Sequence, residues 1–161
     1  MTRVTHEFGP FFRADSELLI LGSFPSVKSR EEAFYYAHPQ NRFWRVLSAC
    51  FDEESPKDLA QKQKLLVRHK IALWDVIEEC DIKGSSDAAI RNAVPTDIDW
   101  LLGQTAIKRV ILNGRTAEKC FVKFHPEFRL PYIALPSTSP ANAAWSLERL
   151  TSEWEKVINQ K

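Results

Sequence analysis

Four short apolar runs alternate with segments in which apolar residues recur every three or four positions. The runs cover residues 18–21, 71–74, 110–112 and 132–135 and show no alternation with polar residues. Continuous runs of this kind are typical of parallel strands whose two faces are both covered. Three of the runs pass into Gly, Asn-Gly or Pro-Ser, as expected where a strand enters a loop.

The intervening segments predict helices. Three- and four-residue spacing of apolar positions marks residues 43–51, 59–66, 117–124 and 147–157. Pro56 predicts the start of the second helix, and Pro140 or Asn142 should lie near the start of the last. Residues 96–99 predict a capped helix with an acidic first turn. Alternating strands and helices favour an α/β fold, a three-layer α/β/α sandwich around a mostly parallel, roughly four-stranded central sheet. We expect residues 1–161 to form a single domain.

Composition places the chain among globular proteins, with 44% hydrophobic and 27% charged residues. No apolar run approaches the roughly 20 residues that a membrane-spanning helix requires. The first residues lack the apolar core of a signal peptide. We therefore expect a cytoplasmic protein that does not bind a membrane, and we expect it to be a monomer.

The three cysteines, Cys50, Cys80 and Cys120, are far apart and form no C-x-x-C pair. Scattered cysteines in odd number suit reduced core thiols better than disulfides, and metal sites generally need ligands close in sequence. The cysteine pattern therefore implies no metal.

Charge is unevenly distributed although the net charge is only +1. Residues 108–129 hold six basic side chains against two acidic ones, and residues 28–45 hold four against two. Residues 74–99 hold seven acidic side chains against two basic ones. A chain with such an imbalance can turn one basic face to phosphates, although solvated helix faces explain the same pattern.

Three polar segments follow the predicted strands and should meet in space. They are residues 22–26, Asn113-Gly114 and residues 136–142. Because ligands of such sheets bind at the carboxyl ends of the strands, we expect these segments to line one site. Their hydroxyl, amide and backbone groups could bind a base or a phosphate.

Three stretches carry a family resemblance: Gly-Ser-Phe-Pro-Ser at 22–26, Tyr-Ala-His-Pro-Gln-Asn-Arg-Phe-Trp at 36–44, and Leu-Pro-Ser-Thr-Ser-Pro-Ala-Asn at 135–142. The chain resembles the uracil-DNA glycosylase superfamily, most closely its hypoxanthine-DNA glycosylases, which are related to the mismatch-specific uracil/thymine-DNA glycosylases. The resemblance spans nearly the whole chain, and the H-P-x-N-R-F-W string is its most specific part. It implies a monofunctional DNA glycosylase that needs no metal or organic cofactor, and whose partner is DNA containing deaminated bases. Such an enzyme flips the base, hypoxanthine first, lets water attack C1′, and leaves an abasic site.

Two departures from relatives determine the expected catalyst. Phe24 stands where mismatch-specific relatives have an Asn that positions the attacking water, and residues 135–137 lack the His of uracil-specific relatives. The resemblance to the hypoxanthine type implies that Asn41 takes over as the catalytic residue. An amide can accept a hydrogen bond from water and hold it near C1′. Asn41 could instead simply cap the helix at 43–51.

The resemblance also implies a base-binding set. Asn113 would read the base, since its NH₂ and C=O match O6 and N1–H of hypoxanthine. Uracil presents the same pair, and adenine reverses it. Tyr36 and Phe24 are candidates to stack on the base, beside Ser23 and Gly22. The alternatives are a turn asparagine at 113 and ordinary core aromatics.

DNA contacts are expected from one loop and from basic side chains. The loop would enter the duplex and fill the gap left by the flipped nucleotide; it consists of Ser137, Thr138, Ser139, Pro140, Ala141 and Asn142. It could also cap the last helix, and the two roles are compatible. Arg42, Lys28 and Arg30 are candidate phosphate contacts, or else solvated surface.

Two other functions stay open. One is a uracil or mismatch-specific glycosylase of the same superfamily. The other is a catalytically silent protein that binds damaged DNA, because Phe24 replaces the usual catalyst. No lysine stands where Schiff-base chemistry would need one, so we expect no strand cleavage. No P-loop or G-x-G-x-x-G follows any strand, which argues against a nucleotide-metabolite protein.

Overall fold

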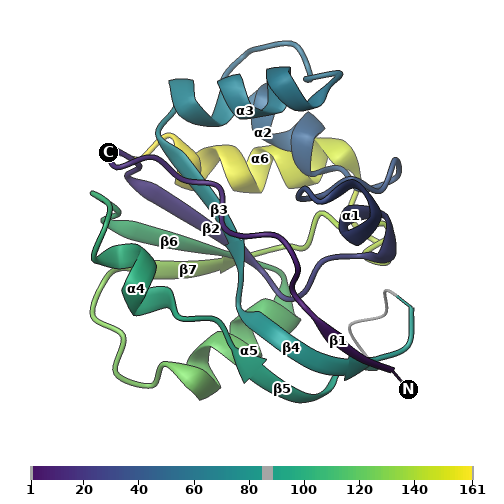
Figure 1. The fold of residues 1–161 in the computed structure, drawn as a ribbon. Helices are drawn as coiled ribbons and strands as arrows, with labels where there is room; N and C mark the ends of the chain where they lie inside the picture. The colour runs from purple at the N-terminus through teal and green to yellow at the C-terminus, as the bar shows by residue number, and fades with distance from the viewer. Residues whose placement is uncertain (1, 85–88, 161) are drawn as a thin grey trace.

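A four-stranded parallel sheet forms the centre of the protein in a computed structural model that describes residues 2–84 and 89–160 (Figure 1). Its strands are β2 (Leu18–Gly22), β3 (Ile71–Asp75), β6 (Arg109–Asn113) and β7 (Tyr132–Leu135). They lie in the order β3-β2-β6-β7. The four predicted strands and their parallel arrangement are confirmed.

Register within the sheet brings the strand ends to one edge. Gly22 of β2 lies opposite Asp75 of β3. Leu21 lies opposite Leu112 of β6, so that Asn113 follows at the same level. All five residues of β2 and all five of β3 are buried, which explains why these sequences are apolar on both faces.

Helices cover both faces of this sheet, which confirms the predicted three-layer α/β/α fold. In Figure 1, α2, α3 and α6 lie on one side and α5 lies on the other. The helices are α1 (Val27–Glu32), α2 (Phe43–Cys50), α3 (Leu59–Arg68), α4 (Ile98–Leu102), α5 (Arg115–Phe124) and α6 (Leu147–Ile158).

Capping chemistry sets the helix starts, and in two cases it differs from prediction. Asp58, rather than Pro56, precedes α3, and its carboxylate accepts a hydrogen bond from the Gln61 amide. The last helix begins at Leu147 and is capped by Ser146, so Pro140 and Asn142, expected near its start, lie before the cap. Asp97 caps α4 as residues 96–99 predict. The short helix α1, capped by Ser26, was not predicted because it is polar and only six residues long.

A small antiparallel sheet was also not predicted. It contains β1 (Thr2–Thr5), β4 (Ile77–Ile82) and β5 (Arg91–Pro95) in the order β1-β4-β5. Most side chains of β1 and β5 are exposed, so these segments carry no apolar run. β4 follows β3 almost directly, and β1 pairs with it, which brings the N-terminal segment to the edge of the large sheet.

Two general features concern the described residues. The cysteines are free; Cys50 and Cys80 are buried and Cys120 is half-buried.

Within residues 2–84 and 89–160 we find no helix with the length and apolar character to cross a membrane.

The packing of α3 against the sheet generates a stability prediction. Leu66 is fully buried, whereas Leu59, on the same helix, is 49% exposed. Leu66→Ala should lower the free energy of unfolding by about 2–5 kcal/mol, because it leaves a cavity in the core. The control Leu59→Ala should change it by no more than about 0.5 kcal/mol. Urea-induced unfolding measures both, and equal effects would contradict this packing.

Candidate functional site

A cavity of about 370 Å³ opens at the edge where β2, β3 and β6 end. It gathers the strand ends, the loop before α2 and the loop after β7. The lining residues are Gly22, Ser23, Phe24, Pro25, Ser26, Ser29, Tyr35, Tyr36, Asn41, Asp75, Asn113, Ser137, Thr138, Ser139 and Ala141. The predicted meeting of the three polar segments is therefore confirmed.

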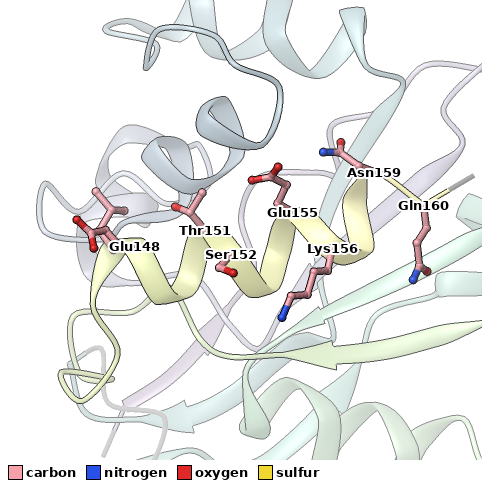
Figure 2. A pocket seen from close by; sticks show the side chains of 8 residues that line it. Glu148, Thr151, Ser152, Glu155, Lys156, Asn159 and Gln160 are labelled. Atoms are coloured by element: carbon pink, nitrogen blue, oxygen red, sulfur yellow. The ribbon is translucent and has the colours of Figure 1, made fainter.

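Two larger hollows lie elsewhere. One, of about 700 Å³, follows a single face of α6 and is lined by side chains such as Glu148, Thr151 and Glu155 (Figure 2). The other, of about 570 Å³, lies beside the loop after β7 and includes Arg115 and Trp145. Neither combines buried polar side chains from several strand ends, so the smaller cavity is the better candidate for chemistry.

Asn41 is held by two hydrogen-bond donors. Its Oδ1 accepts from the Phe43 amide at 2.9 Å and from Thr138 Oγ1 at 2.9 Å. A backbone N–H can only donate, so this atom of the amide is the oxygen. Both of its lone pairs are used, and Nδ2 remains to act on a ligand. The alternative role of Asn41, capping of α2, is also present. Its side chain accepts from the first amide of α2, although Asn41 itself lies one residue before the N-cap, Arg42.

Asn113 is bound to the same threonine. Its Nδ2 donates to Thr138 Oγ1 at 3.0 Å, and the Thr138 amide donates to its Oδ1 at 3.1 Å. Both side chains are buried. The Asn113 amide therefore keeps one N–H and one lone pair for a ligand, and its role as base reader stays a prediction. Asn113, Thr138 and Asn41 form one chain of hydrogen bonds, which we call the threonine bridge.

The segment after β2 forms the floor of the cavity. The Val76 amide donates to Gly22 O at 2.8 Å and the Ile77 amide to Ser23 O at 3.1 Å, so the segment is fixed to the chain that follows β3. Phe24 packs with the apolar side chains of β4 and also lines the cavity. Phe24 is therefore a core residue, as the alternative interpretation held, and also part of the cavity wall.

Tyr36 has a constrained position in the wall. Its φ of 54° lies in the left-handed region, which few residues other than glycine adopt. Its ring stacks on Phe43 with centroids 4.0 Å apart and an angle of 22°. One ring face is thereby covered, and stacking of a base on Tyr36 stays a prediction. The amide of the next residue, Ala37, donates to Ser29 Oγ at 3.0 Å, which holds this loop against α1.

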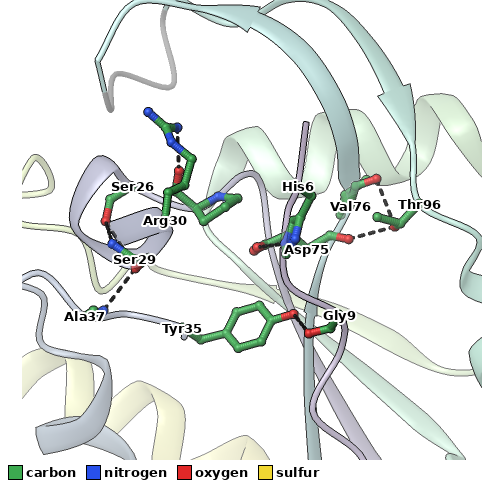
Figure 3. Close-up of polar contacts among 11 residues, drawn as sticks. His6, Gly9, Ser26, Ser29, Arg30, Tyr35, Ala37, Asp75, Val76 and Thr96 are labelled. Atoms are coloured by element: carbon green, nitrogen blue, oxygen red, sulfur yellow. Dashed lines mark hydrogen bonds and ion pairs between the residues drawn. The ribbon is translucent and has the colours of Figure 1, made fainter. Parts of the chain in front are cut away.

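The sequence reasoning missed Asp75 and His6. Asp75 is the last residue of β3, is 3% exposed and lines the cavity. His6 Nε2 lies 2.8 Å from Asp75 Oδ2, and both side chains are buried (Figure 3). An acid directly after an apolar run was a usable signal for Asp75. No such signal existed for His6, because the unpredicted small sheet brings it there.

Arg42 was a candidate phosphate contact, but its guanidinium bonds the protein's own backbone instead. Its guanidinium donates to the backbone oxygens of Ser139 at 2.9 Å and Asn142 at 3.1 Å, and also to that of Trp145. Burial, followed by the nearby Arg45, lowers the pKa of Arg42. Arg42 thus holds the loop after β7 from within.

That loop does not cap the last helix, although Trp154 Nε1 of α6 donates to Pro136 O at its start at 3.0 Å. Asn142 Nδ2 donates to Ser137 O at 3.0 Å, and the Ala141 amide donates to Ser139 Oγ at 3.1 Å. Because Ser146 caps α6, the alternative in which residues 137–142 cap that helix is wrong. Pro140 and Ala141 form its exposed tip.

The other predicted phosphate contacts lie on α1. Arg30 donates to Pro25 O at 3.1 Å and Gly84 O at 3.3 Å, with its guanidinium over the Phe24 ring. Lys28 pairs with Glu32 at 3.4 Å, and its side chain is 43% exposed. Arg30 therefore anchors the floor of the cavity, whereas Lys28 stays available as a surface charge.

Comparisons with known proteins agree with this architecture. The family model described as the uracil DNA glycosylase superfamily matches residues 10–161. A hypoxanthine DNA glycosylase from Methanosarcina acetivorans is 37% identical over 150 residues, covering 89% of this chain and 91% of that protein. A hypoxanthine DNA glycosylase from Methanosarcina barkeri is 33% identical over 158 residues, covering 95% and 97%. The solution NMR structure of a candidate uracil DNA glycosylase from Methanosarcina acetivorans superposes with a TM-score of 0.81 at 32% identity, covering 94% of each chain.

The threonine bridge generates a prediction about stability. Thr138→Val keeps the side-chain shape but removes the acceptor of Asn113 Nδ2 and one donor to Asn41 Oδ1. The variant should lose roughly 1–3 kcal/mol of unfolding free energy, because buried polar groups lose their partners. Thr151→Val, on α6 and outside the bridge, should cost no more than about 0.5 kcal/mol. Chemical denaturation of both variants checks this, and a loss no greater for Thr138→Val than for the control would disprove the bridge.

Proposed function

The chain belongs to the uracil DNA glycosylase superfamily, and we propose that it is a DNA glycosylase that hydrolyses the N-glycosidic bond of deoxyinosine. The observation that carries this proposal is the enclosed polar cavity with Asn41 and Asn113 fixed by Thr138. The substrate assignment is supported by near full-length similarity to two proteins named hypoxanthine DNA glycosylases.

The cavity suits one flipped base. Its walls include the aromatic rings of Phe24 and Tyr36, and polar groups lie at its strand ends. A base within a duplex cannot reach such an enclosed site, so the nucleotide must rotate out of the stack. The exposed tip of the loop, at Pro140 and Ala141, is placed to fill the gap in the duplex. Since one chain forms the whole cavity, we propose that it acts as a monomer.

Asn41 would position the attacking water. Because both lone pairs of its Oδ1 are engaged, the water accepts a hydrogen bond from Nδ2 instead of donating one to the amide oxygen. This reverses the polarity expected from the sequence. The second lone pair of the water is then free to face C1′. The fixed donors keep the amide in place before the substrate arrives, so little reorganisation is needed during the reaction.

The reaction proceeds without a covalent enzyme intermediate. The C1′–N9 bond breaks, its electron pair goes to the purine, and a proton taken from solvent at N7 keeps the departing base neutral. Water then forms a bond to C1′ and releases a proton to solvent. None of the described residues that line the cavity is a lysine, which favours hydrolysis over Schiff-base chemistry and strand cleavage.

Two other functions compete with this proposal. A uracil-directed enzyme of the same superfamily would use the same cavity, and the NMR relative is described as a candidate uracil DNA glycosylase. A silent binder of damaged DNA would keep the cavity without releasing a base. An assay of base release from duplexes carrying inosine, uracil, xanthine or a thymine mismatch distinguishes the three.

Asn41→Ala should slow inosine excision at least about 100-fold, the scale expected for loss of a preorganised catalytic group. Asn41→Ala also removes the acceptor of the Phe43 amide and of Thr138 Oγ1, so its free energy of unfolding should fall. Binding to duplex with an abasic analogue should change little, because Asn41 contacts the water and not the DNA, and this binding shows that the variant is still folded. The matched control is Gln40→Ala, which removes the exposed amide of the neighbouring residue. Single-turnover kinetics with labelled duplexes measures the rates. Inosine excision by Asn41→Ala at the rate of Gln40→Ala would exclude the catalytic role.

Replacement of N7 on the substrate tests how the base departs. In 7-deaza-2′-deoxyinosine a carbon replaces N7, so the purine cannot take up a proton there. The wild-type protein should bind this duplex and compete with the inosine duplex, yet release no base. Excision of both substrates at similar rates would contradict departure through N7 protonation.

A further inference from the structure

A buried acid at the cavity wall, and the buried histidine bonded to it, have no part in the reaction described so far. Asp75 Oδ2 accepts a hydrogen bond from His6 Nε2 at 2.8 Å. The two side chains are only 4% and 1% exposed, so the pair is shielded from water. Burying a carboxylate is costly unless it is bonded, and His6 supplies that bond. His6 also lies outside residues 10–161, so the family match does not account for it.

Backbone contacts fix both partners (Figure 3). The His6 amide donates to Glu78 O at 2.6 Å. The backbone oxygen of Asp75 accepts from Thr96 Oγ1 at 2.7 Å. The Tyr35 hydroxyl donates to Gly9 O at 3.0 Å and holds the segment after His6. The carboxylate therefore has little freedom to turn.

The second oxygen of Asp75 lies beside the end of β2. A β-carbon at Gly22 would be 2.5 Å from Asp75 Oδ1 and 3.0 Å from the Tyr36 hydroxyl. A side chain at Gly22 would displace the carboxylate, so glycine keeps this part of the cavity open. With Oδ2 on His6, Oδ1 is the oxygen that a ligand in the cavity would meet.

Asp75 and the threonine bridge lie on opposite sides of the cavity. β2 separates β3 from β6, so the ends of β3 and β6 are about 10 Å apart, two strand spacings. Asn41 is half-buried, whereas Asp75 is deeply buried. The sugar of a flipped nucleotide stays attached to the DNA at the mouth, and the base goes deepest. Asn41 is therefore placed for the sugar and Asp75 for the base.

Resting on the proposed function, we propose that Asp75, positioned by His6, selects hypoxanthine over uracil: its carboxylate, in place of the Asn113 amide oxygen, accepts N1–H of hypoxanthine and stabilises departure of the N7-protonated base. A negative charge at one edge of the ring attracts the positive charge that develops at the other. The interaction is strengthened in a buried site, where solvent screens poorly. Asp75 touches the substrate and is a catalytic residue in this scheme, whereas His6 acts through it.

Asp75 also disfavours two competing bases, uracil and adenine. Uracil offers N3–H to a carboxylate and could bind, but it leaves as an anion, because it has no N7 to take a proton. The Asp75 charge repels that anion as it forms. Adenine places an acceptor at N1, so two acceptors would face each other. The Asp75 charge already affects one neighbour: burial first, and then Asp75, raise the pKa of Tyr35.

The test compares inosine with uracil in duplexes of the same sequence, under single-turnover conditions. Asp75→Asn keeps the shape but removes the charge. It should slow inosine excision at least about tenfold, as expected for loss of a hydrogen bond to a charged group, and leave uracil excision unchanged or faster. His6→Phe keeps an aromatic ring but no donor and should lower the ratio of inosine to uracil rates. His6→Gln keeps a donor and should restore much of that ratio, which a purely structural role of His6 would not require.

The matched control is Glu53→Gln. Glu53 also bonds a histidine, His69, but the two lie away from the cavity. This variant should keep the wild-type ratio. Thermal unfolding and binding to abasic DNA report whether each variant is folded. If the Asp75 and His6 variants fail to fold, 1-methyl-2′-deoxyinosine tests the same contact in the wild-type protein, which should not excise it.

The outcomes separate this inference from the proposed function. If wild-type protein releases no hypoxanthine, the proposed function fails. If it releases hypoxanthine and Asp75→Asn keeps the wild-type ratio of inosine to uracil rates, the role of Asp75 is wrong. Excision of 1-methylinosine as fast as inosine would overturn it as well.

Discussion

The parallel pairing of β2 with β3 and β6 is the constraint on which the rest of the structure depends. It places Gly22, Asp75 and Asn113 at one edge of the sheet, although they are far apart in sequence. Strands that are apolar on both faces cannot hold polar side chains within the layers. Polar groups therefore collect where the strands end, and there they must find partners or face a ligand.

Partners for these groups come from loops on two sides of the cavity. Thr138 links Asn113 to Asn41, and Arg42 holds the loop that carries Thr138. On the other side, His6 from the N-terminal segment holds Asp75. The same bonds that remove the cost of burial also fix the direction of each side chain. We infer that stability and preorganisation share the same contacts in this site, so variants of Thr138 should affect both.

Much of the fold could be predicted from the sequence, because continuous apolar runs identify buried parallel strands and strand ends identify the site. Asn41, Asn113 and the loop residues Ser137, Thr138, Ser139 and Ala141 do meet at the predicted edge. What failed depended on long-range contacts or local capping. The polar strand β1 is ordered by pairing with β4, so His6 had no sequence signal. Arg42 looked like surface until the loop that surrounds it was known, and Ser146 moved the start of α6.

The central claim is that a flipped hypoxanthine nucleotide occupies this cavity with its sugar beside Asn41 and its base beside Asp75. A crystal structure with duplex DNA that contains a 2′-fluorinated, non-hydrolysable deoxyinosine tests it most directly. The account predicts N1 of the base within hydrogen-bond distance of Asp75 Oδ1, and a water bound to Asn41 Nδ2 facing C1′. A base that stays stacked in the duplex, or one that enters the cavity with N1 turned away from Asp75, would contradict it.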